Sequence, residues 1–267
     1  MRRVLGWATG LWLGGCGLVV AEDGEAEPPE EAWPDLSGIH VAFDVGHSLS
    51  KMGARSARGR GEFLFNQDTA RTVAQALIGA GAKVTIINED GTITGLSVRP
   101  QTAVKKKADV FISLHHDSVN EKYLQTWTFE GTELPYSDDF RGYSVFCSEK
   151  NFLAEKSRKV ALEVGKQMKA AGFPTALHHN EPIPGENRKF WDEETAVYEF
   201  TDLIVAKAGR IPSILLECGV IIHREEELEV QKEAYQVRLA HALAKALSAL
   251  REDKVIGKRK LFGLGLR

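Results

Sequence analysis

The sequence predicts an α/β fold, with a mostly parallel or mixed central sheet and helices on both of its faces. Apolar runs typical of strands alternate along the chain with segments of helical periodicity, the order that places helices against a sheet. Most of these runs are apolar on both faces, so helices should cover both sides. The 267 residues are 43% hydrophobic and carry a net charge of -3. This composition suits a globular domain and provides no basic field that would attract nucleic acid.

The predicted elements follow in order from residue 38. Strands are expected at HVAFDVGH (40–47), AKVTIINED (82–90), DVFISLHH (109–116), RGYSVFCS (141–148) and PSILLECGVII (212–222). Apolar residues at helical spacing predict helices at 67–80, 98–107, 151–171 and 225–250. Gly81 and Gly172 fit the ends of the first and third of these helices.

Between residues 172 and 200 the periodic pattern weakens. The stretch LHHNEPIPGENRKFWDEE is polar and contains two prolines, which predicts a long loop or insertion of the kind that often lies over a site. We favour a solvated loop. One alternative is that the segment reshapes the cleft of the site. Another is that it forms a lid that blocks the site until a partner binds. One of its carboxylates or histidines could also occupy the open coordination position of a metal ion. The side chains suited to such roles are His178, His179, Glu181 and Glu186.

The two ends of the chain carry signals of a different kind. Residues 1–21 begin with a basic pair, turn apolar and predict a secretory signal peptide. The alternative is a lipoprotein signal ending at residue 15, with a lipid anchor on Cys16; an uncleaved span is disfavoured because the apolar run is short. Both place the protein outside the cytoplasm. We expect an acidic, disordered spacer at 22–37, the catalytic domain at 38–252 and a basic tail at 253–267.

The sequence has three cysteines, too few for a disulfide scaffold. Cys147 and Cys218 lie on predicted strands that could be neighbours, and they could pair in an oxidising envelope. We favour the alternative, that both are small, buried and apolar.

Several side chains suited to metal binding or catalysis lie on or after predicted strands. His47 ends the first strand, and His115 and His116 end the third; ligands of open α/β sheets bind beyond the carboxyl ends of strands. Strand alternation points the last two to opposite sides, so one metal would rarely bind both. Glu217 lies in the apolar run SILLECGV, where a carboxylate is costly unless it is paired, metal-bound or protonated. It is either a general base or the partner of a buried arginine such as Arg99.

Two imidazoles and one carboxylate, with a fourth position open for water, form the common catalytic zinc set. Here that set would be His47, Glu62 and one of the pair His115 and His116. By itself Glu62, just ahead of the first predicted helix, is equally well an ordinary partner of the helix dipole. A further carboxylate near the water can act as the base, since zinc lowers the pKa of that water toward ~7.

Together these motifs resemble the zinc-dependent N-acetylmuramoyl-L-alanine amidases of the Amidase_3 type, in the same order over nearly all of residues 38–250. AFDVGH resembles that family's Asp-Pro-Gly-His strand end, Glu62 with Asn66 its Glu-x-x-x-Asn element, and LSVR its helix start. DVFISLHHDS matches Phe-Ile-Ser-Ile-His-x-Asp/Asn, and IPSILLECGVI matches Pro-x-x-Leu-x-Glu-x-Gly. The chain departs from the family pattern at Val45, Ser48, Leu49, His116, Ile222 and His223.

The resemblance implies a phosphorylase/hydrolase-like fold and hydrolysis of the amide between N-acetylmuramic acid and L-alanine in peptidoglycan. It assigns zinc to His47, Glu62 and His115, and the catalytic carboxylate to Glu217. The remaining candidates, for supporting the ligands or contacting substrate, are Arg99, Asp117, His116 and Asn66.

The implied partners are peptidoglycan in the bacterial periplasm or cell envelope and an activator protein. Contact with the membrane is expected only through the lipid anchor at Cys16. Two other functions fit the same residues. A related zinc amidohydrolase or peptidase could act on another amide, with residues 172–200 reshaping its cleft. A catalytically inactive, wall-binding lipoprotein could keep the fold, although retention of the metal and catalytic residues argues against it.

Overall fold

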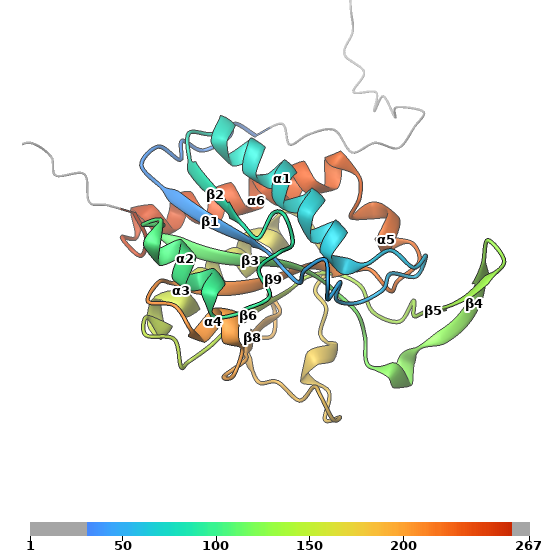
Figure 1. Cartoon of the computed structure of the whole chain (residues 1–267). Helices are drawn as coiled ribbons and strands as arrows, with labels where there is room; N and C mark the ends of the chain where they lie inside the picture. Colours follow the sequence, from blue (N-terminus) through green and yellow to red (C-terminus); the bar gives the residue numbers. More distant parts are fainter. Residues whose placement is uncertain (1–30, 258–267) are drawn as a thin grey trace, which may run out of the picture.

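The centre of the fold is a seven-stranded sheet, seen in a computed structural model that describes residues 31–257 (Figure 1). Its strand order is β2-β1-β3-β9-β6-β8-β7. The strands are β1 (His40–Val45), β2 (Lys83–Ile87), β3 (Val110–Asp117), β6 (Ser144–Cys147), β7 (Phe190–Asp192), β8 (Val197–Glu199) and β9 (Ser213–Val220). Neighbours pair in parallel except β6 with β9 and β7 with β8, which confirms the predicted sheet.

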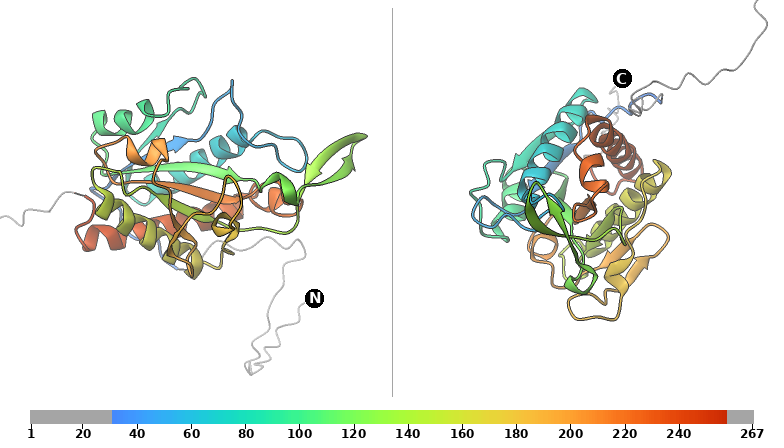
Figure 2. Two further views of the ribbon diagram at one scale, coloured as in Figure 1. Left: turned by 90° about the horizontal axis from the view of Figure 1, so that it is seen from below. Right: turned by 90° about the vertical axis from the view of Figure 1, so that its right-hand side faces the viewer.

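Helices cover both faces of the sheet, as the sequence predicts (Figure 2). The helices of one face are α1 (Glu62–Gly79), α3 (Ala154–Ala170) and α6 (Glu233–Glu252). Of these, α6 contacts both of the others, and together they bury the larger apolar core. The opposite face packs against α2 (Val98–Lys105) and α4 (Ile204–Lys207) over a smaller apolar cluster. Strand alternation therefore sends successive side chains of each central strand to one core and then to the other.

The structure adds a hairpin that the periodicity does not predict. Strands β4 (Gln125–Phe129) and β5 (Thr132–Tyr136) pair only with each other and project from the body as an arm (Figure 1). The turn between them places Glu130 and Gly131 at positive φ, as tight hairpins require. It lacks the Asn-Gly or Asp-Gly pair that marks such turns in a sequence, which is why the hairpin escaped prediction.

Two further segments differ from the predicted elements. The segment at 172–200, predicted as a loop, contributes the three-residue strands β7 and β8 to the edge of the sheet. Strands this short show no alternation in a sequence. The predicted helix at 225–250 is divided into α5 (Glu226–Glu229) and α6, because Lys232 between them is extended, with ψ of 136°. One-turn 3-10 helices are η1 (Glu121–Tyr123) and η2 (His178–Asn180).

The folded domain extends beyond its predicted limits at both ends. Leu36 is fully buried in the larger core, and Trp33 packs against the same core. Past α6, Ile256 is buried there as well. Parts of residues 31–37 and 253–257, predicted as spacer and tail, therefore pack against the domain through these side chains.

The remaining terminal predictions fall on residues outside the described range. They are the signal peptide with Cys16, the spacer up to residue 30 and the tail from residue 258. Within residues 31–257, no helix combines the length and apolar character needed to cross a membrane.

Candidate active site

The candidate catalytic side chains lie at or near the ends of neighbouring parallel strands. His47 follows β1, His115 lies near the end of β3, and Glu217 lies on β9. His115 and Glu217 are register partners across the β3–β9 ladder, so their side chains stand side by side on one face of the sheet. Glu62 is the first residue of α1, which packs against β1 and β3 and brings its carboxylate to the same edge.

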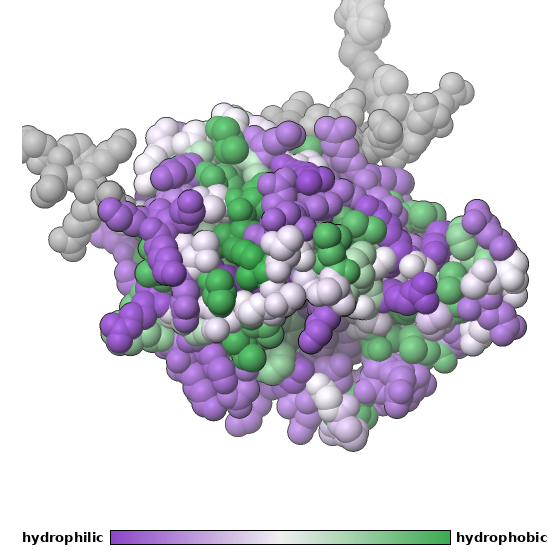
Figure 3. All heavy atoms as spheres, in the orientation of Figure 1, coloured by the Kyte–Doolittle hydropathy of each residue, from purple (hydrophilic) through white to green (hydrophobic). Residues whose placement is uncertain are grey.

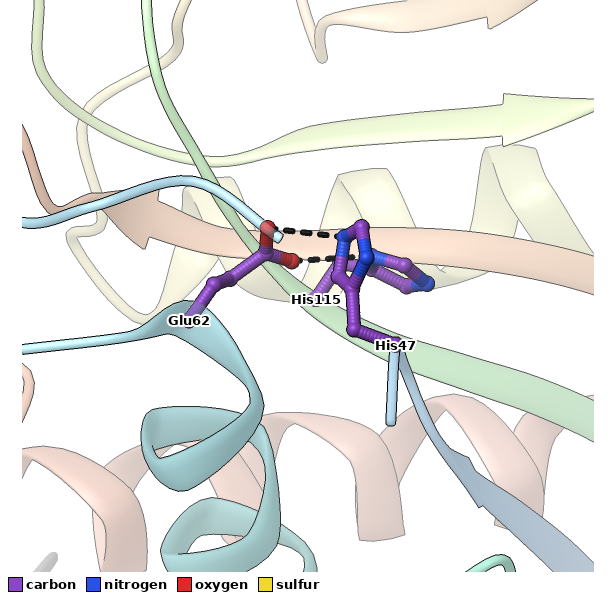
Figure 4. Close-up of side chains that lie close together, drawn as sticks. All are labelled: His47, Glu62 and His115. Atoms are coloured by element: carbon purple, nitrogen blue, oxygen red, sulfur yellow. Dashed lines mark hydrogen bonds and ion pairs between the residues drawn. The ribbon is translucent and has the colours of Figure 1, made fainter. Parts of the chain in front are cut away.

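Three of these side chains converge on one point (Figure 4). His47 Nε2 lies 2.8 Å from Glu62 Oε2, and His115 Nδ1 lies 2.9 Å from Glu62 Oε1. One candidate ligand atom from each residue lies within 4.8 Å of the other two. The side chain of Glu62 is 5% exposed and that of His47 is 32% exposed, so the cluster opens to solvent on the His47 side.

Several donors hold the Glu62 carboxylate in place. The backbone amides of Ala54 and His116 donate to it at 3.0 and 3.2 Å, and the Asn66 side chain donates at 3.2 Å. Burial alone raises the pKa of Glu62, but hydrogen bonds with the two histidines of the cluster lower it below its ordinary value. The carboxylate is therefore charged at neutral pH, as a metal ligand must be.

The backbone around the cluster is shaped to let the three side chains meet. His47 has φ of 65°, a left-handed conformation that costs a non-glycine residue roughly 1–2 kcal/mol. Such strain is typical of functional sites. A Cβ on Gly46 would lie 2.4 Å from His115 Nε2, and a Cβ on Gly53 would lie 2.3 Å from Glu62 Oε2. Glycine at both positions is therefore required for the observed approach of the ligands.

We expect Gly53→Ala to remove metal binding from this cluster, because the new methyl group would displace both Glu62 and the His47 ring. Gly131→Ala is the matched control. Its φ of 79° is close to the 78° of Gly53, but a Cβ there meets nothing within 4 Å. Both variants should lose roughly 1–2 kcal/mol of stability to backbone strain. Only Gly53→Ala should lose zinc in equilibrium dialysis, and full zinc retention by Gly53→Ala would contradict the assignment of the cluster.

His116 points away from the cluster, on the opposite side of β3 from His115. It lies in the interior under α1 rather than at the rim, and it is 1% exposed. Burial lowers the pKa of His116 to about 3, so its ring is neutral, and its Nδ1–H donates to Asn66 Oδ1 at 2.8 Å. Asn66 in turn donates to the Gly46 carbonyl and to Glu62. Through its hydrogen bond to Asn66, His116 therefore helps to orient the Glu62 carboxylate.

Arg99 pairs with Asp44 and not with Glu217, so the interpretation of Glu217 as the partner of a buried arginine is wrong. Arg99 Nη1 lies 3.4 Å from Asp44 Oδ1, both side chains are fully buried, and Ser113 Oγ donates to Asp44 at 2.6 Å. Arg99 Nη2 also donates to the backbone carbonyl of His47. Asp44 and Arg99 thus fix the turn that presents the first histidine of the cluster.

Glu217 has no ion-pair partner among residues 31–257. Its Oε2 is buried and accepts no hydrogen bond from any residue in that range. Burial raises the pKa of Glu217 well above its ordinary value, and the carboxylates of Asp117 and Glu62 raise it further. A carboxyl group in this state, beside two imidazoles and a carboxylate, is suited to proton transfer.

Asp117 does not join the cluster but contacts the segment 172–200. Its Oδ2 lies 3.0 Å from His178 Nε2 and 2.8 Å from His179 Nε2. These histidines are 2% and 7% exposed, so the prediction of a solvated loop is wrong at this point. Glu181 instead lies nearer the surface, 3.1 Å from a lysine of η1. The sequence held no signal for this contact, because Asp117 and His179 are 62 positions apart.

Both Cys147 and Cys218 are free and buried, which excludes the disulfide and confirms the apolar alternative. Their strands are neighbours, as expected. The register pairs Phe146 with Leu215, however, so the two sulfur atoms lie at different heights along the ladder.

The donor set of the cluster fits zinc. Two imidazole nitrogens and one carboxylate oxygen are the protein ligands of many catalytic zinc sites, which keep a fourth position open. The structure brings together the predicted ligands His47, Glu62 and His115, and places Glu217 beside them.

Comparisons with known proteins place this chain in a family. The chain matches the profile of Amidase_3, described as N-acetylmuramoyl-L-alanine amidase, over residues 41–249. The uncharacterized protein YqiI of Bacillus subtilis (strain 168) is 24% identical over 241 residues, covering 90% of this chain and 97% of that protein.

Solved structures share the fold. The N-acetylmuramyl-L-alanine amidase Ami1 of Mycobacterium smegmatis is 18% identical, with a TM-score of 0.64 over 82% of this chain and 99% of that one. The CwlD amidase of Clostridioides difficile, solved in complex with the GerS lipoprotein, is 17% identical, with a TM-score of 0.59 over 80% and 99%. Since the family profile spans nearly the whole folded domain, the chain belongs to the N-acetylmuramoyl-L-alanine amidase family.

Proposed function

We propose that this protein hydrolyses the amide bond between N-acetylmuramic acid and L-alanine in peptidoglycan, with zinc as its cofactor. The observation that carries the proposal is the convergence of His47, Glu62 and His115, with Glu217 as the register partner of His115. Membership of the amidase family supports the choice of bond, and the donor set supports the choice of metal.

Each of the four side chains has one task in this proposal. His47, Glu62 and His115 hold zinc, which when bound polarises the scissile carbonyl and lowers the pKa of water toward ~7. Glu217 accepts a proton from the attacking water and passes it to the leaving nitrogen of L-alanine. The C–N bond breaks, leaving a carboxylate on the muramic acid side and a free amino group on L-alanine. Burial raises the pKa of Glu217 well above its ordinary value, which makes the carboxylate a stronger proton acceptor than an exposed glutamate.

The surface beside the cluster offers an apolar contact for the substrate. Leu49, two positions after His47, is 59% exposed, and Leu96 and Val98 are exposed as well. Figure 3 shows apolar side chains among hydrophilic ones on the face that carries α1 and α2. We propose that this apolar surface, which includes Leu49, where the chain departs from the family pattern, contacts the sugar and the alanine methyl group.

We propose that the protein acts in the bacterial periplasm or cell envelope, where peptidoglycan lies. The basic and then apolar start of the sequence supports export, either through a cleaved signal peptide or with a lipid anchor on Cys16. An activator protein is a further proposed partner, and the CwlD amidase solved in complex with a lipoprotein supports it.

Removal of the metal tests the cofactor. Protein treated with a chelator should release no stem peptides from cell-wall sacculi, and added Zn²⁺ should restore the release, because water is then activated again. The measurement pairs elemental analysis of zinc with chromatography of the released peptides. Undiminished release by metal-free protein would refute the zinc dependence. Protein that binds no zinc and releases nothing would instead support the inactive wall-binding function.

A further inference from the structure

A second group of metal-binding side chains lies outside the proposed zinc site. It consists of Asp117 at the end of β3 and of His178 and His179 in η2, and we name it the Asp-His-His cluster. One ligand atom from each residue lies within 4.8 Å of the other two. His178 Nε2 and His179 Nε2 approach the same atom, Asp117 Oδ2, at 3.0 and 2.8 Å. Two rings thus converge on one carboxylate oxygen.

The Asp-His-His cluster is withdrawn from water. The side chains of His178, His179 and Asp117 are 1%, 9% and 12% exposed. Both ring nitrogens of His178 are buried without a hydrogen-bond partner anywhere in the described part of the chain. Apart from the 3.0 Å approach of Nε2 to Asp117 Oδ2, this imidazole has lost its hydration without gaining a hydrogen bond. A cation that accepts the Nε2 lone pair would supply the missing interaction.

The distances between the ligand atoms are close to those of a tetrahedral metal site. Zinc binds imidazole nitrogen and carboxylate oxygen at ~2.0–2.2 Å, so two ligand atoms of a tetrahedral site lie ~3.3 Å apart. The separations of 3.0 and 2.8 Å in the Asp-His-His cluster are slightly shorter. The ligand atoms of the proposed zinc site are similarly spaced, with separations of 2.8 and 2.9 Å.

Glu186 provides the outer carboxylate that metal-bound histidines commonly have. Its Oε2 lies 2.9 Å from His179 Nδ1. When Nδ1–H donates to Glu186, the Nε2 of a neutral His179 ring carries a lone pair that faces the acceptor Asp117 Oδ2. Two acceptors at this distance repel each other unless a cation lies between them or the ring is protonated.

Protonation of His179 is the alternative to a bound metal ion. Burial lowers the pKa of His179, but the carboxylates of Asp117 and Glu186 raise it to about 9. A protonated ring explains only part of the arrangement, because it leaves both nitrogens of His178 without partners. The Arg188 guanidinium stacks on an aromatic ring and forms no ion pair with either carboxylate within residues 31–257. An ion bound to the Nε2 atoms of both rings gives one nitrogen of His178 a partner, which protonation of His179 does not.

We propose that Asp117, His178 and His179 bind a second divalent transition-metal ion, zinc being the expected species. Imidazole ligands with one carboxylate favour zinc and its neighbours over magnesium or calcium. The ion joins η2 to the end of β3, two residues beyond His115, and so fixes part of the segment 172–200 beside the proposed active site. The Asp-His-His cluster shares no ligand with that site, so either assignment can fail without the other.

The number of zinc ions retained after equilibrium dialysis against Zn²⁺ tests the proposal. Elemental analysis of the wild type should give two equivalents. His178→Gln and His179→Gln should each retain one, because either change removes one ligand of the Asp-His-His cluster. His115→Ala should also retain one, and His115→Ala combined with His179→Gln should retain none. His241→Gln is the matched control, since His241 is a buried histidine of α6 that belongs to neither site, and it should retain two.

Unchanged zinc content in both His178→Gln and His179→Gln overturns the proposal. A fall in those variants but not in His115→Ala would keep the second site and refute zinc at the first. Titration of the metal-free wild type with Co²⁺, followed by visible absorption, covers the case in which the variants do not fold. An endpoint of two equivalents supports the second site. An endpoint of one equivalent that disappears in His115→Ala overturns it.

Discussion

Glu217→Gln is expected to slow the release of stem peptides by roughly 10²–10⁴-fold while the protein keeps its zinc. The amide preserves the volume of the side chain on β9 but cannot accept a proton from water. Glu217 is not among the residues of either metal-binding group, so its replacement should leave the metal ligands intact. Glu217→Ala should give the same two results. Peptide release and zinc content are measured on the same preparation.

The control for this variant is Glu194→Gln, a change of an exposed carboxylate that pairs with Lys169 and should leave the rate unchanged. Unfolding in urea adds a readout that activity alone does not give. Glu217→Gln should be as stable as the wild type or more stable, because a neutral amide of the same size cannot carry the buried negative charge that has no ion-pair partner. A loss of zinc from Glu217→Gln would place Glu217 among the ligands and contradict its role as the base.

His115→Ala should lose one equivalent of zinc and all measurable amidase activity, whereas His116→Ala should keep its zinc. The two adjacent residues differ because β3 turns their side chains to opposite sides. His116→Ala should instead lower the free energy of unfolding by about 2–3 kcal/mol, through the cavity under α1 and the lost hydrogen bond to Asn66. Zinc analysis and urea unfolding on both variants separate the two effects.

Equal loss of zinc from His115→Ala and His116→Ala would contradict the assignment of the metal to His115 alone and of His116 to the opposite side of β3. A second control comes from Asn66→Ala, which removes the hydrogen-bond partner of His116 while leaving both rings. It should weaken zinc binding less than His115→Ala does, because Asn66 only orients the Glu62 carboxylate.

The sequence was informative where local rules apply. Strand alternation separated His115 from His116, and the burial implied by an apolar strand singled out Glu217 as unusual. Residues by themselves could not choose the metal ligand of the histidine pair or give Glu62 a role. Those choices came from the family resemblance, and the structure shows the geometric reason. Glu62 is the first residue of α1, and the packing of α1 against β3 brings its carboxylate to His115. The two residues are far apart in the sequence, so no local sequence pattern could predict this contact.

Contacts between distant segments could not be predicted. Asp44 and Arg99 lie on different elements, and no local pattern predicts that they pair. Because Arg99 pairs with Asp44, it is not the partner of Glu217. Asp117 and His179 meet only because the segment 172–200 folds back over the end of β3. Strands β7 and β8 could not be predicted because three residues are too few to show an alternating pattern. The β4–β5 hairpin could not be predicted because its turn has glutamate where asparagine or aspartate is usual.

The chemical identity of the bond that is cut is the most direct test of the proposed amidase activity. Wild-type protein loaded with zinc is incubated with purified sacculi, and the soluble products are identified by mass spectrometry and amino-terminal analysis. We expect stem peptides that begin with L-alanine bearing a free amino group, together with glycan whose muramic acid carries a free carboxylate and no peptide. Peptides cut between amino acids, glycan fragments that retain their stem peptides, or no products at all would contradict the proposed activity.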